Sequence, residues 1–496
     1  MMDFDDYSLL LAATIVTLVA LVVGRMLHQR MARSKAASSG PRPMSWMEEH
    51  MFLSDCFPKE ANITPACNVI NCEVFFKDGL PAADKVEKLV REDLLSFVRF
   101  SAVPDLKSHG WKMVDVDLAN HIFTYKPVEN RQALDAKVDE IVNTDLPGDK
   151  PLWQVHLLPA ATGAEQKDCV VFRCHHTVAD GLCLVQLLDK VATTPDGKPI
   201  KFVNFKAKKS ATQKSMLGRI LYNFLYSLEW VRSFVSNLRQ AQQPFETDYG
   251  FDAPLSHRSG DMRYSGSRKS ICFEPFSLDY VKAIKNKAPG KITVNDVLLG
   301  AMVGAMRRYG GDAVDDNTIM RMLIPVGAPI DFGANPPPEG DRLGNNWSFA
   351  SADLSKAIRA EDSVARVEIT DAVMNRLKKS LDSTTSNFIT NKLMPLLPPS
   401  KAQHSTKDLY ARHTAIFSNV PGPQLPCCVG GKEIEAVYPI FLTLVEQVIV
   451  MSYNGKFYFN TTLDPNVVTD YEKFEGYYRD ELLDMGKRLG ITDVQL

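Results

Sequence analysis

Residues 168–193 read DCVVFRCHHTVADGLCLVQLLDKVAT, and this stretch decides the fold that we expect. The segment 168–174 has a mostly apolar alternation, which predicts a β-strand. The segment 181–193 has apolar residues at helical spacing and predicts a helix. A strand that leads into a helix, in a chain where strand and helix patterns alternate, indicates an α/β architecture.

The junction between this strand and this helix carries the residues suited to chemistry, HHTVADG from His175 to Gly181. Histidine is the natural general base at neutral pH, because its unperturbed pKa is about 6.5. Such a base must be held in one tautomer and pointed at its substrate. Asp180 lies four residues after His176 and just before Gly181. This pair allows the chain to turn and lets the Asp180 carboxylate fix the local structure. The complete HHxxxDG pattern is therefore much more specific than a histidine pair.

Strand and helix patterns continue on both sides of this motif. Residues 67–76 are β-rich, and an amphipathic, charged helix pattern follows around 81–99. Residues 293–311 predict a helix that ends at a glycine. Within it, Gly300 and Gly304 are spaced for close packing of helices, and flanking charges argue against a transmembrane dimer.

The composition excludes several classes of protein. Of the 496 residues, 45% are hydrophobic and 23% charged, which is enough for a large packed core and unlike a disordered chain. The 57 Lys and Arg residues against 59 Asp and Glu leave a net charge of -2, so we expect no nucleic-acid partner. The 9 cysteines are odd in number and include no Cys-x-x-Cys pair, which favours reduced thiols facing the cytosol and no metal site.

The first residues predict a membrane anchor. Residues 7–24 (YSLLLAATIVTLVALVVG) carry no charge and would span about 27 Å as a helix, enough for a thin bilayer. Aspartates precede this run and arginines follow it, which by the positive-inside rule places the rest of the chain in the cytosol. We expect one transmembrane helix at about 7–27 within an anchor and linker that span 1–42, in a membrane that we expect to be the endoplasmic reticulum.

The remaining chain divides into three parts. We expect a first α/β lobe over 43–205, an amphipathic linker helix within 206–250, and a second α/β lobe over 251–496. In the segment 214–240, apolar residues recur every three or four positions and define one long apolar face. This pattern fits a helix packed between the lobes, and it also fits an interfacial helix on an anionic membrane.

Four further motifs accompany HHxxxDG in order along the chain. They are Pro151-Leu152-Trp153, Asn295-Asp296, Gly344-Asn345 and the sequence SNVPGP from Ser418 to Pro423. With these landmarks, the chain from about residue 43 to 490 resembles the wax ester synthase/diacylglycerol acyltransferase family, particularly its plant-like branch. That family belongs with the chloramphenicol-acetyltransferase-like, CoA-dependent acyltransferases.

The resemblance implies two similar α/β lobes with a tunnel at their interface, which acyl-CoA enters from one side and the acyl acceptor from the other. It implies that His176 takes the proton of the acceptor hydroxyl as that oxygen attacks the thioester carbonyl. His175 would be either structural or a second base. Asp180 would have a structural role by pairing with an arginine, and Gly181 would keep the tunnel open. The resemblance implies no metal, no cofactor and no covalent acyl-enzyme. Acyl-CoA would be the co-substrate.

The roles of the other motifs follow from the same resemblance. Asn295 and Asp296 would position the reaction intermediate or cap their helix, since either residue type is a good cap. Trp153 would pack in the core, and the SNVPGP segment would shape a turn between the lobes. The related plant acyltransferases with a DFGWG motif fit less well, because residues 331–334 read DFGA.

The acceptor stays open at this point. A fatty alcohol would give a wax ester and a diacylglycerol would give triacylglycerol, and both acceptors carry one hydroxyl on an apolar body. Such lipids partition into membranes, so an anchored enzyme would meet them at high local concentration. The alternatives are an acyltransferase for another alcohol and a non-catalytic lipid-binding protein of the same fold.

Overall fold

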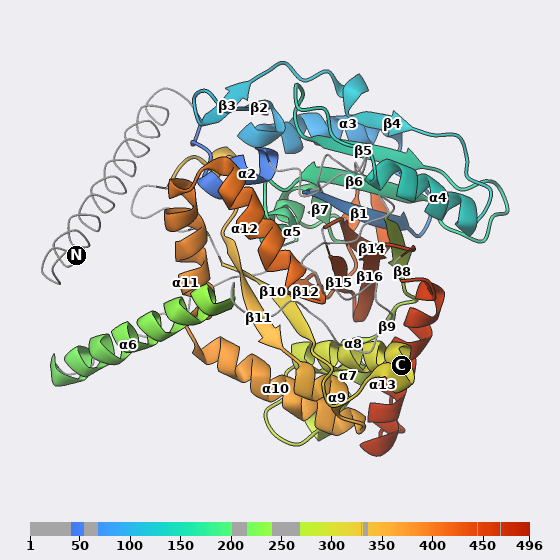
Figure 1. Ribbon diagram of the computed structural model, residues 1–496. Coiled ribbons are helices and arrows are strands. Elements are labelled where there is room, and N and C mark those ends of the chain that lie inside the picture. The colour runs from blue at the N-terminus through green and yellow to red at the C-terminus, as the bar shows by residue number, and fades with distance from the viewer. Residues whose placement is uncertain are drawn as a thin grey trace, which may run out of the picture.

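Two lobes, each built on a mixed β-sheet with helices around it, form the body of the molecule (Figure 1). The computed structural model describes residues 41–53, 68–200, 216–240, 268–328, 330, 336–443, 445–466 and 468–496. The predicted transmembrane helix, Cys56, Cys67 and the DFGA segment lie outside these residues. Across the described ranges, no helix has both the length and the apolar character needed to cross a membrane.

The first sheet has the strand order β4-β5-β6-β1-β14-β13-β7. Its strands are β1 (Val69–Phe76), β4 (Ile122–Thr124), β5 (Trp153–Leu158), β6 (Cys169–His175), β7 (Ala192–Thr193), β13 (Cys428–Val429) and β14 (Lys432–Phe441). The helices of this lobe are α2 (Trp46–Leu53), α3 (Ala83–Glu92), α4 (Arg131–Val142) and α5 (Gly181–Val191). A separate two-stranded ribbon pairs β2 (Ala102–Asp105) with β3 (Gly110–Met113). The strands expected over 67–76 and 168–174 and the helix expected over 181–193 are confirmed as β1, β6 and α5.

The helix expected over 81–99 is shorter than predicted. It ends as α3 at Glu92, and two short 3-10 turns replace its second half. Leu94, Phe97 and Phe100 are all buried there, at a spacing of three residues. Phe97 is extended and separates the two turns, so the chain changes direction here and buries all three side chains without continuing the helix.

One segment of the C-terminal half lies in the first sheet. Strand β14 pairs antiparallel with β1, from Ile70 opposite Phe441 to Phe76 opposite Ile434. The expected division into lobes at 43–205 and 251–496 is therefore not a division in space. Periodicity shows that a segment is a strand but not which sheet it joins, because pairing depends on partners distant in sequence.

The second sheet has the order β11-β10-β12-β15-β16-β8, with β9 also paired to β16. Its strands are β8 (Lys269–Cys272), β9 (Phe276–Ser277), β10 (Arg321–Gly327), β11 (Trp347–Asp353), β12 (Ala415–Pro421), β15 (Glu446–Tyr453) and β16 (Lys456–Leu463). Its helices are α7 (Leu278–Lys287), α8 (Val294–Gly310), α9 (Ser355–Arg359), α10 (Ser363–Lys379), α11 (Asp382–Phe388), α12 (Pro399–Ala411) and α13 (Phe474–Arg488). Between β15 and β16, Asn454 and Gly455 have φ of 46° and 77°, the positive values of a primed hairpin turn.

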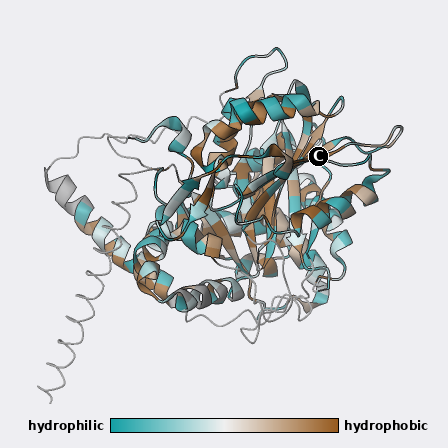
Figure 2. Cartoon of the chain, turned by 90° about the horizontal axis from the view of Figure 1, so that it is seen from above, coloured by the Kyte–Doolittle hydropathy of each residue, from teal (hydrophilic) through white to brown (hydrophobic). Residues whose placement is uncertain are grey.

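Helix α8 forms the centre of this lobe and is buried along most of its length. It ends at Gly311, whose φ of 53° suits glycine, as the predicted glycine stop requires. A Cβ added at Gly300 would collide with Val367 of α10, and one at Gly304 would collide with Glu481 of α13. The expected close packing at the GxxxG motif is therefore confirmed. Figure 2 shows the apolar residues gathered in the strands and on the inward helix faces.

Helix α6 (Met216–Gln240) corresponds to the helix expected over 214–240. It packs on α11 at one end and projects away from the body at the other (Figure 1). It therefore lies beside the second lobe instead of filling the space between the two lobes.

Candidate active site

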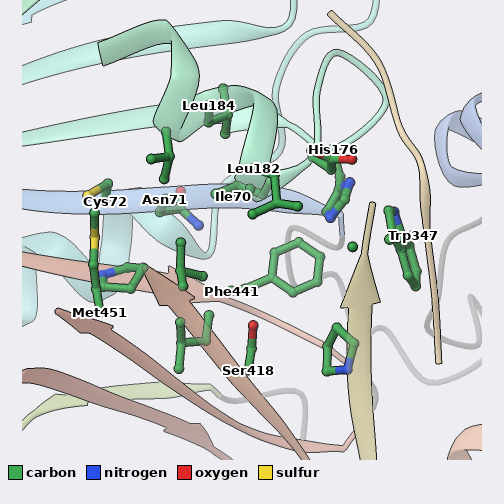
Figure 3. Close-up of a pocket in the computed structure, with 18 of the residues that line it drawn as sticks. Ile70, Asn71, Cys72, His176, Leu182, Leu184, Trp347, Ser418, Phe441 and Met451 are labelled. Atoms are coloured by element: carbon green, nitrogen blue, oxygen red, sulfur yellow. The ribbon is translucent and has the colours of Figure 1, made fainter. Parts of the chain in front are cut away.

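A cavity of about 870 Å³ lies between the two sheets. Its walls come from β1, β14 and α5 on one side and from β10, β11, β12 and β15 on the other. Most of the lining side chains are apolar, among them Ile70, Leu182, Phe441 and Met451 (Figure 3). A volume of this size, with a few polar groups in an apolar lining, is typical of a site for a small organic ligand.

The HHxxxDG motif brings one of its two histidines to this cavity. Strand β6 ends at His175, and the backbone N–H of His176 donates to the carbonyl oxygen of Asn68 at 2.6 Å. The His176 ring lies in the cavity wall near Trp347 and Phe441, at centroid distances of 5.5 Å and 5.4 Å (Figure 3).

Asn345 determines the tautomer of His176. Its Nδ2 donates to the carbonyl oxygen of His176 at 2.8 Å, so its Oδ1 faces the ring, 2.8 Å from Nδ1. An amide oxygen only accepts hydrogen bonds, so Nδ1 carries the proton and Nε2 keeps its lone pair. Asn345 lies in the Gly344-Asn345 motif of the second lobe, so residues from both lobes form this pair.

Opposing effects act on the charge of His176. Burial lowers its pKa, whereas the negative charge of Asp180 and the hydrogen bond to Asn345 act to raise it, and the net pKa is below its usual value. His176 is therefore neutral at neutral pH, as a general base must be. When the ring gains a proton, the carboxylate of Asp180 stabilises the resulting cation.

His175 occupies a different environment. Its Nδ1 accepts the backbone N–H of Thr177 at 3.1 Å, its ring packs edge-on to Phe52, and it is not among the residues that line the cavity. Burial, together with the neighbouring His176, lowers its pKa to about 3. His175 thus stays neutral and holds the turn after β6.

Asp180 makes contacts that differ from the expected arginine pair. Its Oδ1 accepts the backbone N–H of Cys183 at 2.9 Å and so caps helix α5, and its Oδ2 accepts the N–H of Asn346 at 3.0 Å. The helix start needs an acceptor for its free N–H groups, and the carboxylate supplies one. Asp180 and Gly181 both line the cavity, and a Cβ at Gly181 would meet nothing within 4 Å, so this glycine borders open space.

A buried arginine lies near the motif but contacts a different carboxylate. Arg99 pairs with Glu48 of α2, with Nη1 to Oε1 at 2.8 Å, and it also donates to the carbonyl oxygens of Thr177 and Val178 at 3.0 Å. Glu48 Oε1 accepts the backbone N–H of Asn345 at 3.1 Å. Burial acts to raise the pKa of Glu48, but Arg99 and then Arg42 hold it below its usual value. This buried pair joins the histidine turn to the segment that carries Asn345.

No local pattern in the sequence singles out this Glu48–Arg99 pair. The two residues are separated by 51 positions and lie outside all the motifs. Asn345 could have been found from the Gly344-Asn345 motif, although the sequence assigns it no role. The sequence analysis therefore missed three residues that hold the base.

The Asn295-Asp296 motif is remote from the base. Thr293 is the N-cap of α8, and Asp296 completes a capping box by accepting the backbone N–H of Thr293 at 2.8 Å. Asn295 accepts a hydrogen bond from Asn419 at 3.2 Å, and of these two only Asn419 lines the cavity. Capping thus accounts for Asp296, while Asn295 braces a cavity residue.

Two other motifs have clear places in the fold. Trp153 is fully buried and donates from Nε1 to the carbonyl oxygen of Phe100 at 2.9 Å, so it belongs to the core as expected. Residues 418–421 form part of strand β12 and line the cavity, so the turn expected there is wrong for this part of SNVPGP. The strand forms because 415–421 pairs along its length with β15.

Trp347 presents a polar group that no other described residue satisfies. Its Nε1 is buried and has no hydrogen-bond partner, although an indole N–H in a buried place normally finds one. The ring lines the cavity beside His176 (Figure 3). Within the described ranges, no group of three or more His, Cys, Asp or Glu side chains is arranged to hold a metal ion.

Comparisons with known proteins agree with this geometry. The model of the wax ester synthase/diacylglycerol acyltransferase catalytic domain matches residues 90–298, and the model of the C-terminal domain of the same family matches 343–486. The chain is 24% identical, over 84% of its length and 91% of the relative, to wax ester synthase/diacylglycerol acyltransferase 5 of Arabidopsis thaliana.

Two solved structures share the fold. One is the wax ester synthase/diacylglycerol acyltransferase from Marinobacter aquaeolei VT8, with a TM-score of 0.58, 16% identity, and coverage of 90% of this chain and 100% of that one. The other is a variant of the starter condensation domain of rhizomide synthetase RzmA in complex with C8-CoA, with a TM-score of 0.55, 11% identity, and coverage of 93% and 99%. Because two models of one family match in chain order and together cover most of its residues, the chain belongs to the wax ester synthase/diacylglycerol acyltransferase family and is an acyl-CoA-dependent O-acyltransferase.

Proposed function

We propose that this protein is a membrane-anchored enzyme that transfers a long-chain acyl group from acyl-CoA to the hydroxyl of a lipid, either a fatty alcohol or a diacylglycerol. The observation that carries the proposal is the neutral His176, whose Nδ1 is held by Asn345 so that Nε2 is free at a large apolar cavity. The names of the Arabidopsis relatives supply the two acceptor classes, and the C8-CoA complex of a related fold is consistent with acyl-CoA as donor.

In the proposed reaction, Nε2 of His176 takes the hydroxyl proton while the acceptor oxygen attacks the thioester carbonyl. The carbonyl electrons move to oxygen and form a tetrahedral oxyanion. When that intermediate collapses, the C–S bond breaks, the electron pair leaves with the CoA sulfur, and the proton on His176 passes to it. Asp180 stabilises the transient imidazolium, which is the charge that burial would otherwise disfavour.

The oxyanion needs a hydrogen-bond donor, and Trp347 is suited to supply it. Its indole N–H has no partner among the described residues, and its ring lies beside the base and lines the cavity. Donors that are already in place where negative charge develops lower the barrier most when water is excluded. In this proposal a donor that is unsatisfied in the free protein becomes satisfied in the transition state.

The anchor and location belong to the same proposal. The uncharged run at 7–24 and the charges on either side of it support a single-pass helix with the catalytic lobes in the cytosol, on the membrane of the endoplasmic reticulum. An anchored enzyme with an apolar cavity suits acceptors and products that both partition into lipid.

The test uses membranes that contain the full chain, radiolabelled long-chain acyl-CoA, and equal amounts of fatty alcohol and diacylglycerol offered together and separately. Wax ester or triacylglycerol must form, and the ratio in the mixed assay assigns the preferred acceptor. If neither ester forms while a short soluble alcohol is acylated, the acceptor class is wrong. If none of the three acceptors is acylated by a folded chain, a lipid-binding role replaces catalysis.

Asn345→Ala removes the acceptor for the Nδ1 proton of His176. We expect kcat to fall by about 10²-fold, since misplacement of a reacting group by about 1 Å costs this much, whereas the KM for acyl-CoA changes little. Steady-state kinetics on both lipid acceptors measure kcat and the KM for acyl-CoA separately. The control is Asn317→Ala, at an exposed asparagine of the second lobe that does not line the cavity, and it should retain most of the activity. Equal losses in the two variants would contradict the role given to Asn345.

The pH dependence of kcat/KM follows from the lowered pKa of His176. We expect a plateau at neutral and alkaline pH and a fall only below about pH 6.5, the unperturbed value of histidine. Acid also lowers stability, because the unfolded chain binds protons in this range that buried His175 and His156, each with a pKa of about 3, do not. Circular dichroism at each pH separates the two effects, and a midpoint above the unperturbed value would contradict the argument.

A further inference from the structure

Helix α6 packs against the protein partly through polar side chains. Asn237 donates from Nδ2 to the carbonyl oxygen of Asp382 at 2.8 Å and to Oγ1 of Thr385 at 2.7 Å. Ser233 is fully buried, and its hydroxyl accepts the backbone N–H of Leu381 at 3.2 Å. A surface helix normally buries an apolar stripe, so this contact with α11 is the reverse of the usual arrangement.

The opposite side of α6 is apolar and exposed. The exposed fractions are 58% for Phe224, 53% for Leu228, 56% for Val231, 37% for Val235 and 49% for Leu238. These positions are spaced alternately by four and three residues, so they form one continuous stripe along the helix. A contiguous apolar surface that stays exposed marks a site that binds another protein, a membrane or a ligand. We call these five side chains the α6 stripe.

The α6 stripe is linked to the active-site cavity. Trp230, on the same side of α6 as Asn237, packs against Phe388 at a centroid distance of 5.3 Å, and Phe388 is itself 38% exposed. The residues that follow Phe388 supply cavity lining at Ile389 and Met394. Asn237 of α6 also lines the cavity. Exposed apolar surface on α6 and α11 therefore adjoins the apolar wall of the catalytic cavity.

We propose that the α6 stripe inserts into the surface of a lipid bilayer and that the lipid acceptor passes from the bilayer into the cavity beside Asn237. This rests on the proposed function, because only a lipid acceptor would need such a route. Helix α6 has the polar and apolar faces of an interfacial helix, with the protein body covering the polar one. The uncharged run at 7–24 lies within the chain that precedes the first described residue, which favours a bilayer as the occupant of the stripe.

The first test asks directly what covers the stripe. The full chain carries the photo-crosslinking residue benzoylphenylalanine in place of Val231, or in place of Leu483, an exposed apolar residue of α13 that is the matched control. Each protein is reconstituted in phosphatidylcholine vesicles that contain tritiated lipid and is then illuminated. We expect lipid adducts at position 231 in at least about tenfold excess over position 483. Adducts mainly to a second copy of the chain or to another of its segments, or no excess of lipid adducts, would overturn the proposal.

The second test asks whether the stripe serves lipid entry. The full-length double variant Leu228→Glu/Val231→Glu should transfer acyl groups to vesicle-borne diacylglycerol or fatty alcohol at least about tenfold more slowly, because charge resists insertion into lipid. Transfer to hexanol in solution should remain near the unmodified rate, and Leu483→Glu should leave both rates unchanged. Equal losses on lipid and on hexanol would contradict a delivery role.

The two tests fail in different ways. Crosslinking reports on α6 whether or not any ester forms, so it stands apart from the proposed function. If lipid adducts form at position 231 but the unmodified protein acylates nothing, the proposed function fails and the membrane contact stands. If the unmodified protein is active and position 231 contacts no lipid, the α6 proposal alone fails.

Discussion

His176→Ala lowers kcat for ester formation by about 10³-fold, within the range that a positioned general base contributes. The substitution removes Nε2, the nitrogen that takes the hydroxyl proton, while the apolar cavity that binds both substrates stays in place. The KM for acyl-CoA should therefore change little. Single-turnover kinetics with radiolabelled acyl-CoA measure the chemical step apart from product release.

Two controls make this result specific. Added imidazole should restore part of the activity of His176→Ala, because the lost ring leaves room beside Trp347 for a free base. His175→Asn keeps an acceptor for the N–H of Thr177 and should retain most of the activity. If His176→Ala retains activity close to that of the unmodified protein, His176 is not the base.

Trp347→Phe is expected to lower kcat by about 10²-fold, the lower end of the cost of losing one oxyanion donor. Phenylalanine keeps an aromatic ring beside His176 but removes the indole N–H, which has no partner among the described residues, together with part of the ring volume. The free protein loses no hydrogen bond among the described residues, so its thermal stability should fall only by the cost of the smaller ring. If kcat falls while KM stays unchanged, the lost interaction is one that forms only in the transition state.

The matched control is Trp111→Phe. The Nε1 of Trp111 is also buried and unpartnered, but its ring contacts Arg99 and does not line the cavity. This variant should retain nearly full activity. A kcat for Trp347→Phe that matches that of Trp111→Phe would show that Trp347 serves only to pack the cavity wall.

The elements that local pattern specifies agree with prediction. Strands β1 and β6, helices α5 and α8, and the Asn454-Gly455 turn each depend on residues within one segment, so their periodicity and turn chemistry suffice. The helix expected over 81–99 ends at Glu92, because the residues after it form two short turns that bury Leu94, Phe97 and Phe100. Strand β14 pairs with β1 in the first sheet, and local pattern did not predict this because the two strands are more than 350 residues apart in sequence.

The candidate site divides in the same way. HHxxxDG marks the base, the helix cap and the glycine beside open space, because these residues act within one strand-to-helix turn. The resemblance implied an arginine partner for Asp180, but its carboxylate accepts two backbone N–H groups, and the buried Arg99 pairs with Glu48. Hydrogen-bond partners are a property of positions in space, and a motif does not specify them.

The sequence by itself determined the α/β class, the family, the histidine motif and the apolar periodicity of α6, because each is written in residues close together along the chain. Only the tertiary structure decided which tautomer His176 holds and which face of α6 is exposed. It brought Asn345 and Trp347 from the second lobe to His176 of the first. A base, its acceptor and an oxyanion donor must meet within a few ångströms, and only folding brings residues about 170 positions apart to that distance.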